Sequence, residues 1–263
     1  MIILTEEDKH KIKQEKNIKV KKVELSTGTY YVKYIYEENI FKELLGKKIA
    51  DIIGLECPNC YMIKDEHCLL SEAVQESKIF KYAYEFGKIY TLNDLQSALE
   101  NERDKNGYYN NVEEIMNQIY LMHSVDILFS NIDRHEGNYG FSLHSNGTGI
   151  LVIYDHDDIL ENLHLATRPV SFPESDGLDY ARYTKEAELR YFLEQYPEAP
   201  EIIKQILPKF NPIIIKLIME KIERETNHKF KCKKKLLKNY LKNYIMINKV
   251  ILQENKQNKN KKI

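Results

Sequence analysis

The sequence has few of the features that several common protein classes require. Its four cysteines include one CxxC pair, Cys57 and Cys60, with no second pair at zinc-finger spacing, so we expect buried, reduced thiols. No apolar run approaches the length of a membrane span, and the charged N-terminal segment does not resemble a signal peptide. Glycine is scarce as well, with only Gly28 before Gly46. We therefore expect a soluble, cytoplasmic protein without a membrane span.

Charge is nearly balanced overall but unevenly distributed. Residues 229–263 contain twelve lysines and one acid, a net charge of +11, which leaves −12 for residues 1–228 and −1 for the whole chain. The simplest interpretation of this lysine-rich terminus is a solvated, partly disordered end, and a role with RNA, an acidic partner or a membrane surface stays open as the alternative. Any contact with nucleic acid is expected only through this basic tail. The 263 residues, 43% of them hydrophobic, are enough for about two lobes or domains.

The segments NIDRHEGNYG, residues 131–140, and IYDHDD, residues 153–158, carry the strongest functional signal. Phosphoryl transfer needs a carboxylate that accepts the proton of the attacking hydroxyl, and an amide and a second carboxylate that hold magnesium against the nucleotide phosphates. Asp133, Asn138 and Asp155 provide this set in order, and the first two have the DxxxxN spacing of kinase catalytic loops. The preceding helix has one apolar stripe, formed by Ile115, Ile119, Met122, Val125 and Phe129. These patterns predict a phosphotransferase.

Two apolar, β-prone runs after Asn138 predict a β-hairpin that ends just before Asp155. If Asn146 and Gly147 are the two central turn residues, the numbers of paired positions sum to 293, which places Asn138 opposite Asp155. Opposed residues lie about 5 Å apart, close enough for an amide oxygen and a carboxylate to share one small cation. The hairpin therefore predicts a shared metal site.

The N-terminal part shows another strand–turn–strand pattern, with Lys33 in the second strand. A helical pattern follows from Glu38 to the residue before Gly54, which is placed to end the helix. A strand lysine followed by a helix glutamate is the pair that orients nucleotide phosphates in kinases. Spacing alone leaves the glutamate open, because Glu43 lies within the helix while Glu37 and Glu38 are nearer to the strand.

These segments resemble the HipA-like kinases and, more distantly, the phosphatidylinositol kinases, whose shared centre reads NxDRHxxN. NIDRHEGNYGF matches that centre, and ENIFKELLGKKIADIIGLECPNCYMI resembles the helix that follows their lysine strand. The resemblance implies an α+β, two-lobed protein-kinase-like fold: a small β-rich N-lobe (1–73), a larger, mainly helical C-lobe (74–252) and a basic, disordered tail (253–263). A hinge around residues 69–73 would place backbone groups beside the adenine of ATP, with Ser71 among the cofactor-binding residues.

On the nucleotide side, the resemblance implies that Lys33 binds the α-phosphate of ATP and that Glu43 orients this lysine. HipA-like proteins also carry a phosphate-clamping loop before the lysine strand. Because Gly28 is the only glycine before Gly46, the clamp here is reduced or built differently. The turn at Gly28 could still present backbone N–H groups to phosphate oxygens.

On the catalytic side, the resemblance implies that Asp133 is the catalytic base and that Asn138 and Asp155 bind Mg²⁺. Asp157 is a further candidate metal ligand. For His135 two roles stay open: a catalytic-loop residue that contacts phosphate directly, or a structural residue hydrogen-bonded near the base.

We therefore expect an ATP- and Mg²⁺-dependent kinase that transfers the γ-phosphate to Ser or Thr of a protein substrate, with the protein itself as one candidate substrate. The resemblance also implies an antitoxin as a candidate partner. Two alternatives stay open: a lipid or small-molecule kinase of the phosphatidylinositol-kinase type, and a pseudokinase that binds without catalysis. The presence of Lys33, Asp133, Asn138 and Asp155 argues against the pseudokinase.

Overall fold

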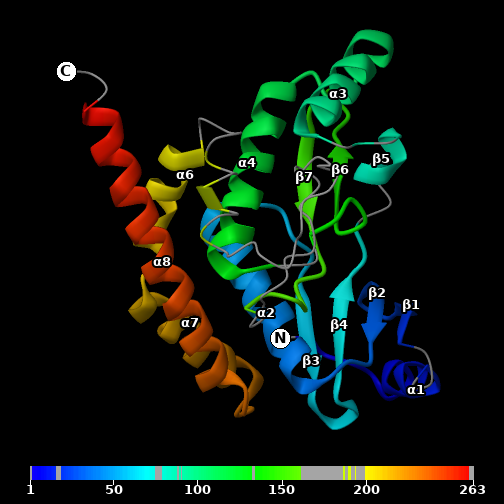
Figure 1. Ribbon diagram of the computed structural model, residues 1–263. Helices are drawn as coiled ribbons and strands as arrows, with labels where there is room; N and C mark the ends of the chain where they lie inside the picture. Colours follow the sequence, from blue (N-terminus) through cyan, green and yellow to red (C-terminus); the bar gives the residue numbers. More distant parts are fainter. Residues whose placement is uncertain are drawn as a thin grey trace, which may run out of the picture.

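In the part of the chain that the structure describes, there are two antiparallel sheets and a set of helices, the α+β architecture that the sequence predicts (Figure 1). No helix in the described part of the chain is both long and apolar enough to cross a membrane. The computed structural model describes residues 2–15, 19–74, 79–87, 89, 91–131, 134–160, 186, 189–190, 193 and 199–260.

The first sheet carries Lys33 and has the strand order β1–β2–β4–β3, with all neighbours antiparallel. Its strands are β1 (Val20–Leu25), β2 (Gly28–Lys33), β3 (Cys60–Ile63) and β4 (Cys68–Glu72). Helix α1 (Glu6–Gln14) packs on this sheet through Ile12, which lies in a small core with Val32 and Leu70. The β1–β2 hairpin therefore has its own support, and Lys33 stands at the end of a strand held on both sides.

The predicted hinge, residues 69–73, overlaps the end of the first sheet. Residues 69–71 are inside β4, where they pair with both β2 and β3, so their backbone groups belong to the sheet. Residues 69–71 are therefore interior to the sheet, because β4 is a central strand, and adenine binding at residues 72–73 stays a prediction. The chain leaves the first sheet only after Glu72, and the next strand, β5 (Ile79–Tyr82), belongs to the second sheet.

The second sheet has the order β5–β6–β7 and carries the hairpin of the candidate site. Its hairpin strands are β6 (Tyr139–Leu143) and β7 (Gly149–Ile153). Helices α3 (Leu92–Asn106) and α4 (Val112–Phe129) share a hydrophobic core with these strands. The five residues of the predicted apolar stripe on α4 are all buried, as expected. Helix α4 thus leads directly into the catalytic-loop segment.

Helix α2 (Glu37–Ile53) joins the first sheet to the helical part of the molecule. It ends at Gly54, whose φ of 77° lies in the left-handed region that favours glycine, as the sequence predicts. The apolar face of α2 shares a core with α7 (Pro212–Thr226) and α8 (Lys233–Asn260). In this core the ring centroids of Phe41 and Phe230 lie 4.6 Å apart. The helix that carries Glu43 is therefore fixed by the C-terminal helices.

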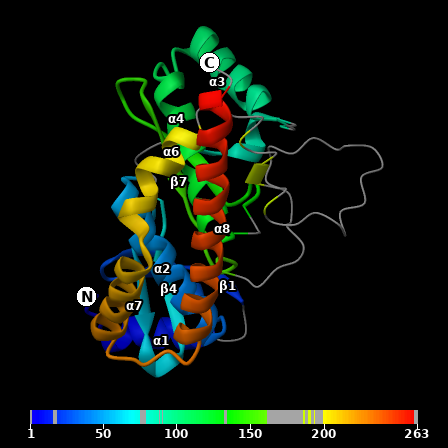
Figure 2. The ribbon, with the colours of Figure 1, turned by 60° about the vertical axis from the view of Figure 1, so that its left-hand side comes forward.

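Helix α8 runs along the outside of the molecule beside α7 (Figures 1 and 2). The shorter helix α6 (Ala199–Ile206) packs against α4. Helix α8 continues to Asn260, so it includes residues 253–260 of the predicted tail. Residues 261–263 lie outside the described residues.

Candidate active site

The predicted hairpin β6–β7 is present, but its register differs from the prediction by one residue. Tyr139 pairs with Ile153 and Leu143 with Gly149, so the numbers of paired positions sum to 292, not 293. The difference arises in the turn, where Gly147 has a φ of 81° and its N–H donates to the carbonyl oxygen of residue 144 at 3.0 Å. A left-handed glycine after a tight turn makes a three-residue loop instead of a two-residue one. The extra loop residue shifts the pairing.

As a consequence, Asn138 lies opposite Tyr154 rather than Asp155. The Tyr154 N–H donates to the Asn138 carbonyl oxygen at 3.1 Å. Asp155 is the next residue, and its φ of 58° lies in the left-handed region, which Asp tolerates better than most residues. Asp155 therefore follows directly after the residue that pairs with Asn138. The sequence did not predict this pairing.

Lys33 connects segments that are far apart in the sequence. Its Nζ donates to Glu43 Oε1 at 2.5 Å and to Asp155 Oδ1 at 3.1 Å. Burial alone would lower the pKa of Lys33, but the two carboxylates outweigh it and raise the pKa above the ordinary value. The lysine is therefore held as a cation at the end of β2.

Of the three glutamates that spacing left open, Glu43 is the one that contacts Lys33. Its side chain is 2% exposed, and its Oε2 accepts a hydrogen bond from the backbone N–H of His156 at 3.0 Å. Burial raises the pKa of Glu43, and the Lys33 ammonium acts against that rise. The other two glutamates instead contact the segment 231–235. Both oxygens of Glu43 are therefore used in positioning.

Asp155 shares the Lys33 ammonium with Glu43 but lies in a different environment. Its side chain is 39% exposed, against 2% for Glu43. Burial would raise the pKa of Asp155, but Lys33 reverses the effect and lowers it below the ordinary value. Asp155 is therefore a charged carboxylate that solvent and small ligands can reach.

Arg134 organises the loop in a way that the sequence did not show. It is 3% exposed, and its Nη1 donates to the carbonyl oxygens of Asn138 and Tyr154, both at 2.9 Å. Its Nε donates to Asp126 Oδ2 at 3.0 Å. These bonds tie the catalytic-loop segment and the end of β7 to helix α4. Asp126, an acid in an otherwise apolar turn of α4, was the available sequence signal for a buried ion pair.

His156 and Gly46 also belong to this buried framework and were not identified from the sequence. The Nδ1 of His156 lies 3.2 Å from Nη2 of Arg134. Burial, followed by the Arg134 charge, lowers the pKa of His156 well below its ordinary value, so the ring is neutral. An ideal Cβ on Gly46 would lie 2.3 Å from the His156 Cβ. Gly46 therefore lets α2 come close enough for Glu43 to reach the His156 N–H, and a glycine within a helix was the signal for this contact.

The remaining catalytic-loop residues are placed as follows. Asp133 lies outside the described residues. Asn138 is 4% exposed, and its N–H donates to the carbonyl oxygen of His135 at 2.9 Å. The ring of His135 accepts a hydrogen bond from the Gly137 N–H at its Nδ1, also at 2.9 Å. This contact stabilises the turn of the loop, while a phosphate contact of His135 stays a prediction.

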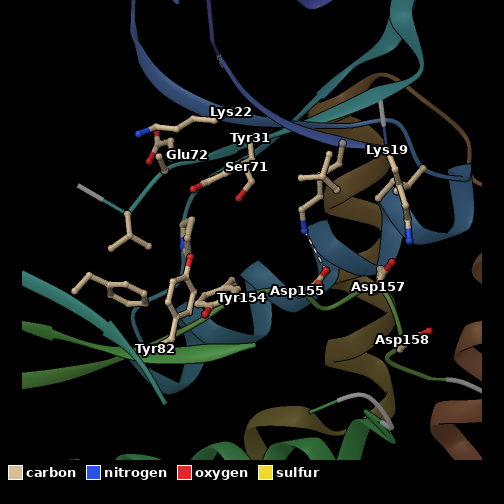
Figure 3. A pocket seen from close by; sticks show the side chains of 17 residues that line it. Lys19, Lys22, Tyr31, Ser71, Glu72, Tyr82, Tyr154, Asp155, Asp157 and Asp158 are labelled. Carbon is tan, nitrogen blue, oxygen red and sulfur yellow. Dashed lines mark hydrogen bonds and ion pairs between the residues drawn. The ribbon is translucent and has the colours of Figure 1, made fainter. Parts of the chain in front are cut away.

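A pocket of about 470 Å³ is lined by Lys33 and Asp155 among others. Figure 3 shows Tyr82 and Tyr154 at one end of the pocket and Lys19, Asp157 and Asp158 at the other. A volume of this size is in the range of small-molecule and cofactor sites. The aromatic end has flat apolar faces on which a nucleobase can stack, whereas the other end is charged. The shape and polarity therefore suit a nucleotide.

Ser71 and Asp157 both line this pocket, and ligand binding by either residue stays a prediction. Ser71 is 8% exposed and offers its hydroxyl, since its backbone lies within β4. Asp157 Oδ2 accepts a hydrogen bond from Asn39 Nδ2 at 3.0 Å, so this carboxylate is partly engaged by helix α2. The Tyr154 hydroxyl is buried and has no hydrogen-bond partner among the residues that the structure describes.

The donor set of the pocket fits magnesium. Magnesium that accompanies a nucleotide takes one or two protein carboxylates, with phosphates and water as the other ligands. Asp155 and Asp157 supply two carboxylates that line the pocket. Asn138 is buried and pairs with Tyr154, the residue before Asp155, and it is not among the lining residues. Within the described ranges, no group of three or more His, Cys, Asp or Glu side chains is placed to hold a metal ion.

The fold and the site together define a two-lobed, kinase-like protein. The chain matches the crystal structure of the Helicobacter pylori proinflammatory kinase CtkA with a TM-score of 0.60 and 16% identity, over 89% of this chain and 92% of that one. It also matches HipA of Shewanella oneidensis MR-1, solved with HipB and its operator DNA, with a TM-score of 0.51 and 12% identity. That match covers 86% of this chain and 58% of HipA.

These structural matches confirm the resemblance to HipA-like kinases at the level of the fold. No protein-family model and no curated protein sequence matches the chain significantly. With identities of 12–16%, the shared fold is therefore visible in three dimensions and not in overall sequence similarity.

Proposed function

We propose that this protein is an ATP- and Mg²⁺-dependent kinase that transfers the γ-phosphate to a Ser or Thr hydroxyl of a protein substrate. The observation that carries the proposal is the contact of Lys33 with both Glu43 and Asp155 at the wall of a nucleotide-sized pocket. Kinases use the same lysine–glutamate pair and metal-binding aspartate to hold nucleotide phosphates. The fold shared with the kinase CtkA supports the same class.

Each residue would contribute a separate part of the chemistry. Lys33, held as a cation, would bind phosphate oxygens, while Glu43 keeps it in position. Asp133, by its place in the DRHEGN motif, would accept the proton of the attacking hydroxyl. Asp155 and Asn138 would hold magnesium. Bound magnesium would neutralise charge on the phosphates during transfer.

Incubation with labelled ATP tests the proposal. The purified full chain is incubated with γ-labelled ATP and Mg²⁺, alone and with cell lysate. Label recovered as phosphoserine or phosphothreonine supports the proposal. Label that extracts with lipid would instead indicate a lipid kinase, and nucleotide binding without any transfer would indicate a pseudokinase. Either result would overturn the proposed activity.

Variants separate binding from transfer. Asp133→Asn should abolish transfer but keep Mg²⁺-dependent binding of a non-hydrolysable ATP analogue, because it removes the proton acceptor and leaves the metal ligands. Lys33→Ala should weaken both. Lys21→Ala is the matched control: the Lys21 Nζ contacts Glu15 at 2.7 Å, away from the pocket, so transfer should be unchanged. Calorimetry measures binding, and label incorporation measures transfer.

A protein partner belongs to the same proposal. The HipA structure contains HipB and operator DNA, and we propose an antitoxin-type protein as a partner of this chain. Affinity purification of the tagged protein from its host, followed by mass spectrometry, would test this. Recovery of the chain alone, at native expression level, would contradict it.

A further inference from the structure

Helix α8 presents the same face to solvent at all times, because its opposite face is locked into the core. Leu236, Tyr240 and Ile247 are fully buried there. Two buried amides add specific contacts. Asn239 Nδ2 donates to the Leu160 carbonyl oxygen at 2.9 Å. Asn243 Nδ2 donates to the hydroxyl of Ser130, the residue that caps the C-terminus of α4, at 2.5 Å. Rotation of α8 about its axis would break these bonds. The identity of its outer face is therefore fixed.

The outer face of α8 carries two parallel rows of side chains. One row is aliphatic, and its members are 42%, 59% and 61% exposed: Leu241, Ile245 and Leu252. The other row is cationic and exposed: Lys238, Lys242 and Lys249. Both rows have the spacing i, i+4, i+11, which keeps the members of each row on one edge of an α-helix. Figure 2 shows α8 lying lengthwise on the outside of the molecule, so both rows belong to one long ridge.

The cationic row is largely unneutralised. Between Lys233 and Gln253 the helix contains no acidic residue. Neither Lys238 nor Lys242 has an ion pair within the described part of the chain, while Lys249 lies 3.6 Å from a Glu186 oxygen. The rest of the chain, residues 1–228, carries a net charge of −12. Helix α8 is therefore strongly cationic, whereas the chain that precedes residue 229 carries a net negative charge.

The combination of the two rows decides what this face can bind. Nucleic acid would satisfy the lysines but would leave the aliphatic side chains without apolar partners. A second copy of the same face would bring lysine row against lysine row. A protein partner that accepts one helix face would need a groove with both an apolar floor and an acidic rim to satisfy the two rows. An anionic lipid surface satisfies both rows, because lysines meet phosphates while aliphatic side chains enter the headgroup–acyl boundary.

We propose that the outer face of α8 binds the surface of an anionic lipid bilayer, with the row of Leu241, Ile245 and Leu252 inserted and the row of Lys238, Lys242 and Lys249 on lipid phosphates. The acidic remainder of the molecule then faces away from the membrane, which orients the protein on it. The binding is reversible, since each lysine near such a surface adds only about five-fold to the affinity.

Vesicle sedimentation tests this with the full chain. Vesicles of phosphatidylcholine with phosphatidylglycerol should retain the protein, and vesicles of phosphatidylcholine alone should not. The double variant Lys238→Gln/Lys242→Gln should lose about 25-fold in affinity. The double variant Leu241→Ser/Ile245→Ser should lose at least as much, and its circular dichroism should match that of the parent because both side chains are exposed.

The matched control lies on α7. Lys216 and Lys221 are also exposed, but each has an acidic neighbour: the Lys216 Nζ lies 3.9 Å from Glu220, and the Lys221 Nζ lies 3.7 Å from Glu225. The double variant Lys216→Gln/Lys221→Gln should therefore bind vesicles like the parent. Three results would overturn the proposal: no preference for anionic vesicles, full binding by the Leu241/Ile245 variant, or an equal loss with the α7 control. Tighter binding of duplex DNA than of vesicles, insensitive to the aliphatic substitutions, would identify a nucleic-acid surface instead.

Discussion

The two sides of the Lys33 ammonium differ in exposure, although each provides a carboxylate. On one side Glu43 is almost completely buried, receives the His156 N–H and is backed by Gly46 and Arg134. On the other side Asp155 is 39% exposed and opens to the pocket. A buried carboxylate whose oxygens are both engaged can only position the lysine. An exposed one keeps coordination capacity for a ligand or metal.

Because of this difference, substitutions on the two sides of Lys33 should affect activity and stability differently. Substitutions on the open side should reduce phosphoryl transfer and leave the fold intact, because exposed ion pairs contribute less than about 1 kcal/mol to stability. Substitutions on the buried side should cost stability as well, because a buried charge or hydrogen-bonding group loses its partner.

Of the two carboxylates that contact Lys33, Asp155 should have the larger effect on transfer when it is replaced by Asn. We expect a loss of about 100- to 1,000-fold in kcat and a loss of Mg²⁺-dependent ATP binding, because the metal loses its charged ligand. Asn also tolerates the left-handed backbone at this position, where φ is 58°, so the free energy of unfolding should change by less than about 1 kcal/mol. Label incorporation, calorimetry and chemical unfolding measure these quantities. Unchanged nucleotide binding with magnesium would contradict the metal-site assignment.

Compared with Asp155→Asn, Glu43→Gln should reduce transfer less and stability more. The amide still accepts the His156 N–H but no longer balances the charge of Lys33, whose side chain is only 14% exposed. We expect about ten-fold slower transfer, since Lys33 keeps Asp155, and a loss of about 1–3 kcal/mol in unfolding free energy. Equal stability of Glu43→Gln and Asp155→Asn would show that burial does not distinguish the two sides.

Gly46→Ala tests the close approach behind Glu43. In most helix interiors this change stabilises, but here the new Cβ would lie 2.3 Å from the His156 Cβ and Cγ. We expect a net loss of about 1–3 kcal/mol in unfolding free energy and weaker nucleotide binding, because α2 must move away from His156. A stabilised variant with normal binding would show that the contact can relax at no cost to the site.

The buried histidines predict a pH dependence of stability. Burial lowers the pKa of His123 from 6.5 to about 4, and burial together with Arg134 lowers that of His156. Below the unfolded-state pKa the unfolded chain binds protons that the folded chain does not, so stability must fall as the pH decreases from about 6.5 to about 4. Each histidine contributes up to about 1.4 kcal/mol per pH unit within that window.

His123→Leu checks this contribution, with urea unfolding measured across the same range. The unfolding free energy of the variant should fall less steeply with decreasing pH than that of the parent, because one of the two buried histidines is gone. His10→Leu is the control, because His10 lies exposed on α1. Equal slopes for the parent and His123→Leu would contradict the buried neutral form of His123.

The smallest expected effect is that of Asp157→Asn. Asp157 lines the pocket, but its Oδ2 accepts a hydrogen bond from Asn39, so part of its capacity is used within the protein. We expect a change in kcat of less than about ten-fold and nearly unchanged stability, compared with the much larger loss for Asp155→Asn. A loss equal to that of Asp155→Asn would make Asp157 an equal metal ligand.

Local sequence patterns were enough to predict the elements of this site. The DxxxxN spacing, the hairpin after it, the apolar stripe of α4 and the helix that ends at Gly54 all depend on residues close together in the chain. Periodicity, turn chemistry and capping act over a few residues, so they can be recognised without knowing the fold. The resemblance to HipA-like kinases rests on the same short motifs.

The tertiary structure alone decided how these elements meet. Which glutamate contacts Lys33 depends on the packing of α2 against α7 and α8, nearly 200 residues later in the chain. The roles of Arg134 and His156 depend on burial, which no local pattern reports. The hairpin register turned on the conformation of one residue, Gly147, since a single left-handed φ adds one residue to the loop and moves every pair in the ladder. Local propensities thus determined which pieces form, whereas long-range packing determined which side chains share a site.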